Sequence, residues 1–87
     1  MSYGPYVLVY TRRAKKDIEK LSPKLKKKLQ EILTEVIIGN PWEGYKLQGD
    51  LEGNYSFRLS YQDRIVYSID NHKHIVYIKR AKTHYGE

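Results

Sequence analysis

Two arginines in the second half of the chain have the residue type and spacing to hold a phosphate group. Arg58 alternates with Phe57 and Leu59, so its side chain should leave the face that those two residues share. Arg64 opens the next apolar run a few residues later and can lie close to Arg58 across a turn. Guanidinium groups bind phosphate through paired hydrogen bonds and stabilise the extra charge of a pentavalent phosphorus. The pair predicts a phosphate site; the alternative is a solvated strand face with ordinary surface arginines.

The end of the chain adds a group that can transfer protons. His84 is followed by Tyr85 and preceded by the cations Arg80 and Lys82. Histidine titrates near neutral pH and serves as a general acid or base. Tyrosine stacks on unpaired bases or donates a hydrogen bond to a phosphate. Together with the two arginines, these residues predict phosphodiester chemistry; the alternative for His84 is an incidental residue of the tail.

The sequence lacks the residues that several other kinds of active site require. There is no cysteine, which excludes disulfides, thiolate catalysis and a zinc ribbon. His72 and His74 are closely spaced, but no acidic or thiol partner completes a recognisable metal site. The chain has no phosphate-binding glycine loop, no nucleophile elbow and no paired catalytic carboxylates. We therefore expect neither a metal nor a cofactor.

Composition indicates a small basic domain with a polyanionic partner. The 87 residues suffice for one domain, residues 1–87, and the 16 Lys and Arg against 10 Asp and Glu give a net charge of +6. Residues 24–28 form a basic helical run that could follow phosphates or meet an acidic protein, although a solvated helix surface is the alternative. No apolar run approaches the ~20 residues of a membrane span, and no secretory signal opens the chain, so we expect a cytoplasmic protein that does not enter membranes.

The elements that must position these residues follow from the apolar pattern. Residues 6–10 are β-branched and aromatic, which favours a strand. Thr11 can cap a first helix, and Ser22-Pro23 is typical of the start of a second one, which Gly39 and Pro41 should end. Apolar residues recur at helical spacing in both segments, and the short joint between them predicts a helical hairpin.

Three strand-like runs follow an irregular, glycine-rich stretch at residues 42–53. They lie at residues 55–60, 64–69 and 74–78, and the short polar gaps between them predict an antiparallel meander. The order is β-α-α-β-β-β. This predicts an α+β fold with the helical hairpin on one face of a small, mainly antiparallel sheet, and with the first strand beside a later one. Arg58 and Arg64 would then lie on the uncovered face.

At this point the motifs resemble those of a known family. The segment KLQGDLEGNYSFRL at residues 46–59 is similar to the K-L-x-G-x-L-x-G-x-Y-S-x-R-(I/L) segment of the Txe/YoeB branch of RelE-like toxins. RIVY at residues 64–67 and RAKTHY at residues 80–85 follow in the order found in that family. The resemblance extends over most of the chain, because the β-α-α-β-β-β order is also the family's.

The resemblance implies an activity and a set of roles. It implies a metal-independent endoribonuclease that cleaves messenger RNA in the ribosomal A site, by attack of a 2′-OH on the adjacent phosphate, and that a small antitoxin neutralises. Arg64 would stabilise phosphate charge, with Arg58 supporting the same site. His84 would be the general acid or base, and Tyr85 would help place the substrate. A homodimer or a toxin–antitoxin hetero-oligomer is a further expectation.

One position departs from the family pattern. The YoeB-type site uses a glutamate as base just before the (K/P)-L pair, where this chain has Tyr45. Glu43 lies two residues upstream. His84 would then work with another partner, such as Lys46 or Lys82, and these two lysines with Arg80 are predicted to bind the RNA.

Two other hypotheses remain open. The first is a non-catalytic inhibitor of DNA gyrase with the same fold, as in ParE-type toxins. The second is a basic domain that binds RNA or ribosomes without cutting. A histidine–tyrosine pair near the chain end at residues 84–85 favours the nuclease, because neither alternative needs an acid or base there.

Overall fold

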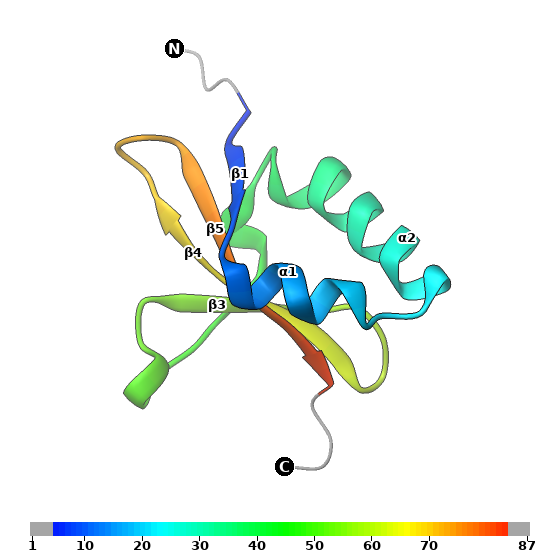
Figure 1. The fold of residues 1–87 in the computed structure, drawn as a ribbon. Coiled ribbons are helices and arrows are strands. Elements are labelled where there is room, and N and C mark those ends of the chain that lie inside the picture. Colours follow the sequence, from blue (N-terminus) through cyan, green and yellow to red (C-terminus); the bar gives the residue numbers. More distant parts are fainter. Residues whose placement is uncertain (1–4, 84–87) are drawn as a thin grey trace.

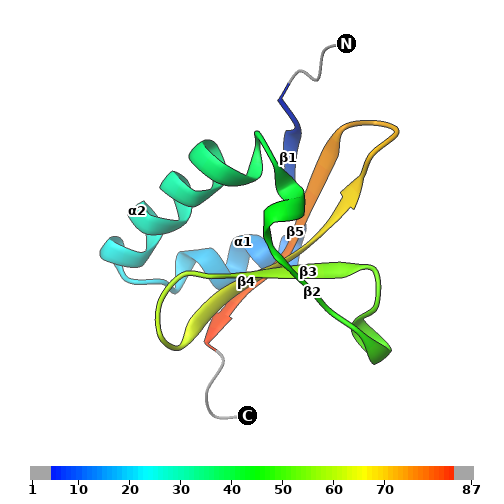
Figure 2. The ribbon, with the colours of Figure 1, turned by 180° about the vertical axis from the view of Figure 1, so that it is seen from behind.

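The computed structural model describes residues 5–83 and consists of a twisted five-stranded sheet with two helices on one face (Figures 1 and 2). The strands lie in the order β1-β5-β4-β3-β2. The elements are β1 (Val7–Tyr10), α1 (Arg12–Glu19), α2 (Pro23–Ile32), β2 (Tyr45–Lys46), β3 (Asn54–Arg58), β4 (Asp63–Asp70) and β5 (Ile75–Thr83). The predicted α+β class and element order are confirmed, and the two-residue strand β2 is an addition.

Both helices begin where the sequence predicts. The Thr11 hydroxyl accepts a hydrogen bond from the Ala14 amide at 3.1 Å, and the Ser22 hydroxyl accepts one from the Leu25 amide at 3.2 Å. Each cap satisfies an amide that has no partner within its helix. Helix α2 ends in a π turn, Leu33–Ile37, shortly before Gly39.

The hydrophobic core lies between the helices and one face of the sheet. Its buried members are Ala14, Leu29, Ile32, Leu33, Ile37, Leu59, Ile65, Tyr67, Val76, Ile78 and Ala81. Among the described residues, Tyr67 is the largest fully buried side chain, and its hydroxyl donates a hydrogen bond to the Pro41 carbonyl at 2.8 Å. Burial raises the pKa of Tyr67 to about 12, so the hydroxyl keeps its proton and remains a donor. A Cβ at Gly44 would overlap this hydroxyl, which explains a glycine there.

Strand β1 is the only parallel member of the sheet in the described residues; it pairs with β5 from Val7↔Ile75 to Tyr10↔Ile78. The β4–β5 ladder is irregular at Val66/Tyr67, where the partner changes from Arg80 to Ile78 and Lys79 is passed over. After this bulge, the residues of β5 that face the core change from even-numbered to odd-numbered positions. Ala81 therefore joins Ile78 in the core, whereas strict alternation would have turned Arg80 inward.

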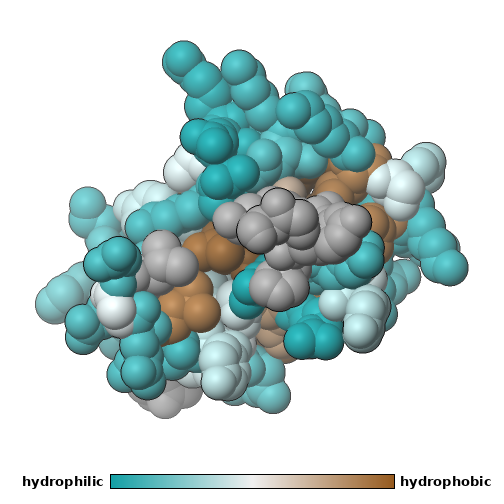
Figure 3. All heavy atoms as spheres, turned by 90° about the horizontal axis from the view of Figure 1, so that it is seen from below, coloured by the Kyte–Doolittle hydropathy of each residue, from teal (hydrophilic) through white to brown (hydrophobic). Residues whose placement is uncertain are grey.

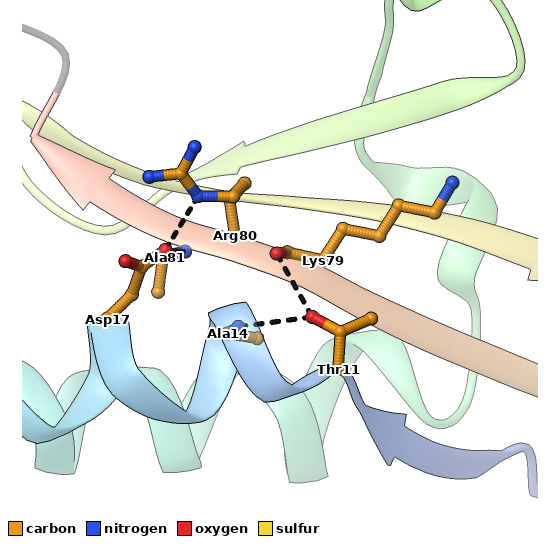
Figure 4. A network of polar contacts seen from close by, with 6 residues as sticks. All are labelled: Thr11, Ala14, Asp17, Lys79, Arg80 and Ala81. Atoms are coloured by element: carbon orange, nitrogen blue, oxygen red, sulfur yellow. Dashed lines mark hydrogen bonds and ion pairs between the residues drawn. The ribbon is translucent and has the colours of Figure 1, made fainter.

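Beyond the end of β1, helix α1 and its N-cap residue make hydrogen bonds to the edge of β5 that β1 no longer covers (Figure 4). Asp17 Oδ2 accepts hydrogen bonds from Arg80 Nε at 2.8 Å and from the Ala81 amide at 3.0 Å. Thr11 Oγ1 donates to the Lys79 carbonyl at 3.2 Å. Burial of Asp17 would raise the pKa of its carboxyl, but the hydrogen bonds and charge of Arg80, with the Ala81 amide, hold that pKa below its usual value. Helix α1 thus fixes the last part of β5.

Candidate functional site

The sheet face opposite the helices carries the two arginines that were singled out in the sequence. Arg58 and Arg64 are direct partners across the β3–β4 ladder, so their side chains leave the same face. Phe57, Ile65 and Tyr67 leave the other face and pack on the core. The structure therefore brings the two arginines together as the alternation predicted.

A pocket of about 390 Å³ opens beside this pair. Two exposed tyrosine rings, Tyr45 (74% exposed) and Tyr61 (87% exposed), lie on its lining, whereas Ser56 in β3 is buried. The complete lining is Tyr45, Ser56, Arg58, Ser60, Tyr61, Gln62, Asp63 and Arg64. The pocket combines two cations, one carboxylate, hydroxyl groups and aromatic surface; cations and aromatic rings are groups that can bind a nucleotide.

The turn between β3 and β4 is held rigidly where it meets the pocket. The Leu59 amide donates to the Asp63 carbonyl at 2.7 Å, and Ser60 Oγ donates to Asp63 Oδ2 at 2.8 Å. Ser60 Oγ also accepts from the Asp63 amide at 3.2 Å. These bonds close the turn around Ser60 and fix the start of β4. The position of Arg64 is thereby set by local hydrogen bonds as well as by the sheet.

Strand β5 ends beside the same pocket. Its register places Lys82 opposite Arg64 and Thr83 opposite Asp63. His84 and Tyr85, the predicted acid–base and substrate-placing residues, lie outside the described residues, and so does the side chain of Lys82. Thr83, the last described residue, thus lies opposite a residue of the pocket lining.

Two predicted RNA-binding cations are not in this group. Lys46 pairs with Tyr55, on the face of the sheet opposite to that of Tyr45, because the short strand β2 takes its register from β3. Arg80 directs its Nε to Asp17 of α1 and is 31% exposed. Neither residue lines the pocket with Arg58 and Arg64, and their contact with RNA stays a prediction.

Sequence reasoning also missed part of the site. The sequence marks Tyr45 as a departure from a family glutamate and predicts no role for it, yet its side chain lines the pocket. The sequence predicts residues 61–63 only as a polar connection between two strands, and all three line the pocket. A turn directly between two arginine-bearing strands was the available signal. Glu43 does not line the pocket, and its carboxylate accepts a hydrogen bond from Asn40 Nδ2 at 3.1 Å.

The described residues hold no group of three His, Cys, Asp or Glu side chains that could bind a metal ion. His74 instead stacks on Tyr6. No helix within residues 5–83 has the length and apolar character to cross a membrane. Seen from the end at which β5 leaves the sheet, the surface of the described residues is largely hydrophilic, with hydrophobic residues visible between them (Figure 3).

Comparison with known proteins gives a consistent result. The model of the ParE-like toxin of type II bacterial toxin–antitoxin systems matches residues 8–86. The sequence is 33% identical over 85 residues to Toxin RelE of Mycobacterium tuberculosis, with 93% of this chain and 87% of that protein covered.

Solved structures of toxins share the fold. The RelBE2 toxin–antitoxin complex of M. tuberculosis contains a chain with a TM-score of 0.84 and 28% identity, covering 94% of each chain. The intact RelBE complex of E. coli gives a TM-score of 0.79 at 29% identity, covering 90% of this chain and 95% of that one. The YoeB-YefM complex of Staphylococcus aureus gives 0.74 at 28% identity, covering 92% and 98%.

Proposed function

The chain belongs to the ParE-like toxins of type II bacterial toxin–antitoxin systems, within the RelE/ParE superfamily, and from this premise we propose that it is a metal-independent endoribonuclease. Its substrate is messenger RNA, cleaved in the ribosomal A site. The observation that carries this proposal is the direct cross-strand pair of Arg58 and Arg64 over a pocket beside the end of β5.

The arginine pair supports an anionic ligand on energetic grounds. Like charges directly opposite each other on adjacent strands destabilise a sheet. An anion between the Arg58 and Arg64 side chains would offset this repulsion, and a phosphodiester offers two oxygens to their guanidinium groups. The pair would bind the scissile phosphate and stabilise the extra negative charge that develops when phosphorus becomes pentavalent.

In the reaction, phosphorus exchanges its bond to the 5′-oxygen for a bond to the 2′-oxygen. The 2′-oxygen attacks the adjacent phosphorus, and its proton passes to a general base. The bond to the 5′-oxygen breaks, and a general acid protonates that oxygen. The products are a 2′,3′-cyclic phosphate and a free 5′-hydroxyl. His84 performs proton transfer, because it follows a strand whose last described residue, Thr83, lies opposite Asp63 of the pocket. Tyr85 helps to place the substrate.

Tyr45 occupies the position at which YoeB-type toxins have a glutamate, and it takes a different part in the site. A phenol is a much weaker proton acceptor than a carboxylate. Its ring is 74% exposed on the pocket lining and is suited to stack on a base next to the scissile bond. Substrate placement would therefore be the role of Tyr45, and proton transfer would rest with His84.

An antitoxin protein is the expected regulatory partner. The similar M. tuberculosis, E. coli and S. aureus chains come from toxin–antitoxin complexes. The net charge of +6 would favour an acidic antitoxin segment that covers the pocket and excludes RNA. Neutralisation would then be competition for the same arginines.

Expression of the chain without an antitoxin tests the function. We expect growth to stop, and primer extension to find new messenger RNA 5′ ends within translated codons. Growth arrest with unchanged RNA ends would contradict the proposal and favour a ParE-type inhibitor of DNA gyrase. His84→Gln gives the control for a non-cutting RNA-binding domain, since that alternative leaves arrest intact in this variant.

A further inference from the structure

A second pocket lies at the other end of the sheet. It has a volume of about 400 Å³ and is lined by Tyr6, Gly39, Pro41, Trp42, Asn71 and His74. The turn between β4 and β5, which contributes two of these residues, lies at the end of the sheet away from the point where β5 leaves it (Figure 1). Strand β4 runs from Asp63 at the first pocket to Asp70 near the second, about 23 Å at the usual rise per residue. The two pockets are therefore separate sites.

The second pocket has a preorganised aromatic wall. The rings of Tyr6 and His74 stack with centroids 4.5 Å apart and planes 8° from parallel. The Tyr6 hydroxyl donates a hydrogen bond to Asn71 Oδ1 at 2.7 Å. Trp42 is 48% exposed and packs edge-on against Tyr55, with ring centroids 5.8 Å apart. Three rings are thus positioned before any ligand arrives, which lowers the ordering cost of stacking.

His74 is held in an unfavourable backbone conformation. Its φ is 56°, and it is the only non-glycine residue with positive φ in the described part of the chain. Glycine would form this turn without the steric cost of a Cβ. Such conformations persist where the surroundings impose them, and they concentrate at binding sites. The turn alone does not explain a histidine, and the ring that it carries stacks on Tyr6 and lines the pocket.

We propose that this second pocket binds an unpaired nucleobase of an RNA nucleotide, packed against the aromatic wall that Trp42 and the stacked Tyr6–His74 pair form. Bases stack on aromatic side chains whatever their identity. Asn71 carries an amide nitrogen, and His74 ring nitrogens, that hydrogen-bond to no other described residue and can meet the polar edge of a base. The proposal rests on the proposed function only in taking RNA as the ligand.

Charge favours RNA over an aromatic side chain of a protein. The chain carries a net charge of +6, and the exposed His72 and Lys73 belong to the same turn as Asn71. A cation beside a stacking pocket suits the phosphate of the bound nucleotide. The pocket would hold a segment of the RNA well away from the bond that is cut, and would extend the footprint of the substrate beyond the first pocket.

Trp42 is the only tryptophan and provides the probe. Adenosine, titrated into the full chain, should quench Trp42 fluorescence to saturation. In His74→Gly the affinity should fall by about tenfold or more, the usual scale for losing one stacking partner. The fold should survive, because glycine accepts the backbone conformation of residue 74, and thermal unfolding checks this. Tyr61→Leu, which removes a ring from the first pocket, is the matched control and should leave quenching unchanged.

The outcomes separate this proposal from the nuclease. Adenosine has no phosphodiester, so its binding does not depend on cleavage. Absence of saturable quenching, or unchanged affinity in a folded His74→Gly, would overturn the second site alone. Stronger quenching by N-acetylphenylalaninamide than by adenosine would also overturn it and assign the pocket to a protein partner. If adenosine quenches Trp42 to saturation but the protein cuts no RNA, the proposed nuclease activity is refuted and the proposed nucleobase site is retained.

Discussion

The two faces of the sheet differ sharply although the same strands build them. On the face toward the helices, Ile65 and Tyr67 of β4 are fully buried. On the other face, Arg64 lies opposite Arg58 of β3 at the edge of a pocket. Alternation by one residue separates a hydrophobic core from a charged surface. Stability should therefore depend on one set of positions and activity on the neighbouring set.

The difference also supports placing the proposed site on the outer face. A surface selected for stability alone would avoid two arginines on opposed positions of adjacent strands. Arg58 and Arg64 hold those positions, and the hydrogen-bonded turn at Ser60 and Asp63 keeps them in register. The core fixes the sheet, and the sheet in turn holds these two arginines side by side at the pocket.

The largest expected effect comes from the residues proposed to act in cleavage. Arg64→Ala and His84→Gln should each lower the rate of RNA cleavage by at least about 100-fold, the usual loss for one charge-stabilising or proton-transferring group. Thermal unfolding should change little. Arg12→Ala, which removes an exposed arginine at the start of α1, is the matched control and should cut normally. Normal cleavage by both site variants would refute these assignments.

A substitution on the core face should have the opposite pattern. Ile65 is fully buried between β4 and the helices, so Ile65→Ala should lower the free energy of unfolding by about 2–5 kcal/mol through lost burial and the cavity left behind. Urea unfolding measures this. Arg58→Ala, on the adjacent strand and opposite face, should change stability by about 0.5 kcal/mol or less. A similar loss in both variants would end the distinction between the faces.

Gly44 tests the packing that joins the core to the strand bearing Tyr45. Gly44→Ala would place a methyl group against the Tyr67 hydroxyl and 2.9 Å from the Ser56 carbonyl, and should cost about 1–3 kcal/mol of stability. Combining it with Tyr67→Phe, which removes the hydroxyl, should recover part of this loss. Denaturant unfolding of the two single variants and the double variant gives the coupling, and strict additivity would contradict the contact.

The smallest effect concerns the clamp between α1 and β5. The pKa of Asp17 is lowered in the folded protein, so this carboxylate stabilises the fold above its ordinary pKa. That contribution is lost as pH falls below about 4 and through the folded-state pKa. Asp17→Asn keeps an acceptor for the Ala81 amide but ends the ion pair with Arg80. It should cost about 1 kcal/mol at neutral pH and reduce the acid sensitivity of thermal unfolding. Parallel acid profiles of the two proteins would contradict this.

Much of the fold was predictable because local signals agree with the tertiary structure. Thr11 and Ser22-Pro23 mark helix starts through bonds to amides three residues away, which need no knowledge of the rest of the chain. The β3–β4–β5 meander follows from alternation and short polar gaps. Strand β2 was missed because its two residues carry no pattern of their own.

The site was less predictable because it depends on register. Alternation placed Arg58 and Arg64 on one face, but Lys46 follows the pairing of β2 with β3, which no local pattern specifies. The bulge on β5 sets the side to which Arg80 and Ala81 turn, and Asp17, distant in sequence, then binds Arg80. These are contacts between elements far apart in the chain.

Analysis of the cleaved ends tests the central claim most directly. The purified chain is incubated with a defined messenger RNA on ribosomes, and the new ends are identified chemically. The account predicts 5′-hydroxyl ends that polynucleotide kinase labels without prior phosphatase treatment, with a 2′,3′-cyclic phosphate on the upstream fragment and no requirement for divalent metal beyond that of the ribosome. Intact RNA, or new ends bearing 5′-phosphates, would contradict it.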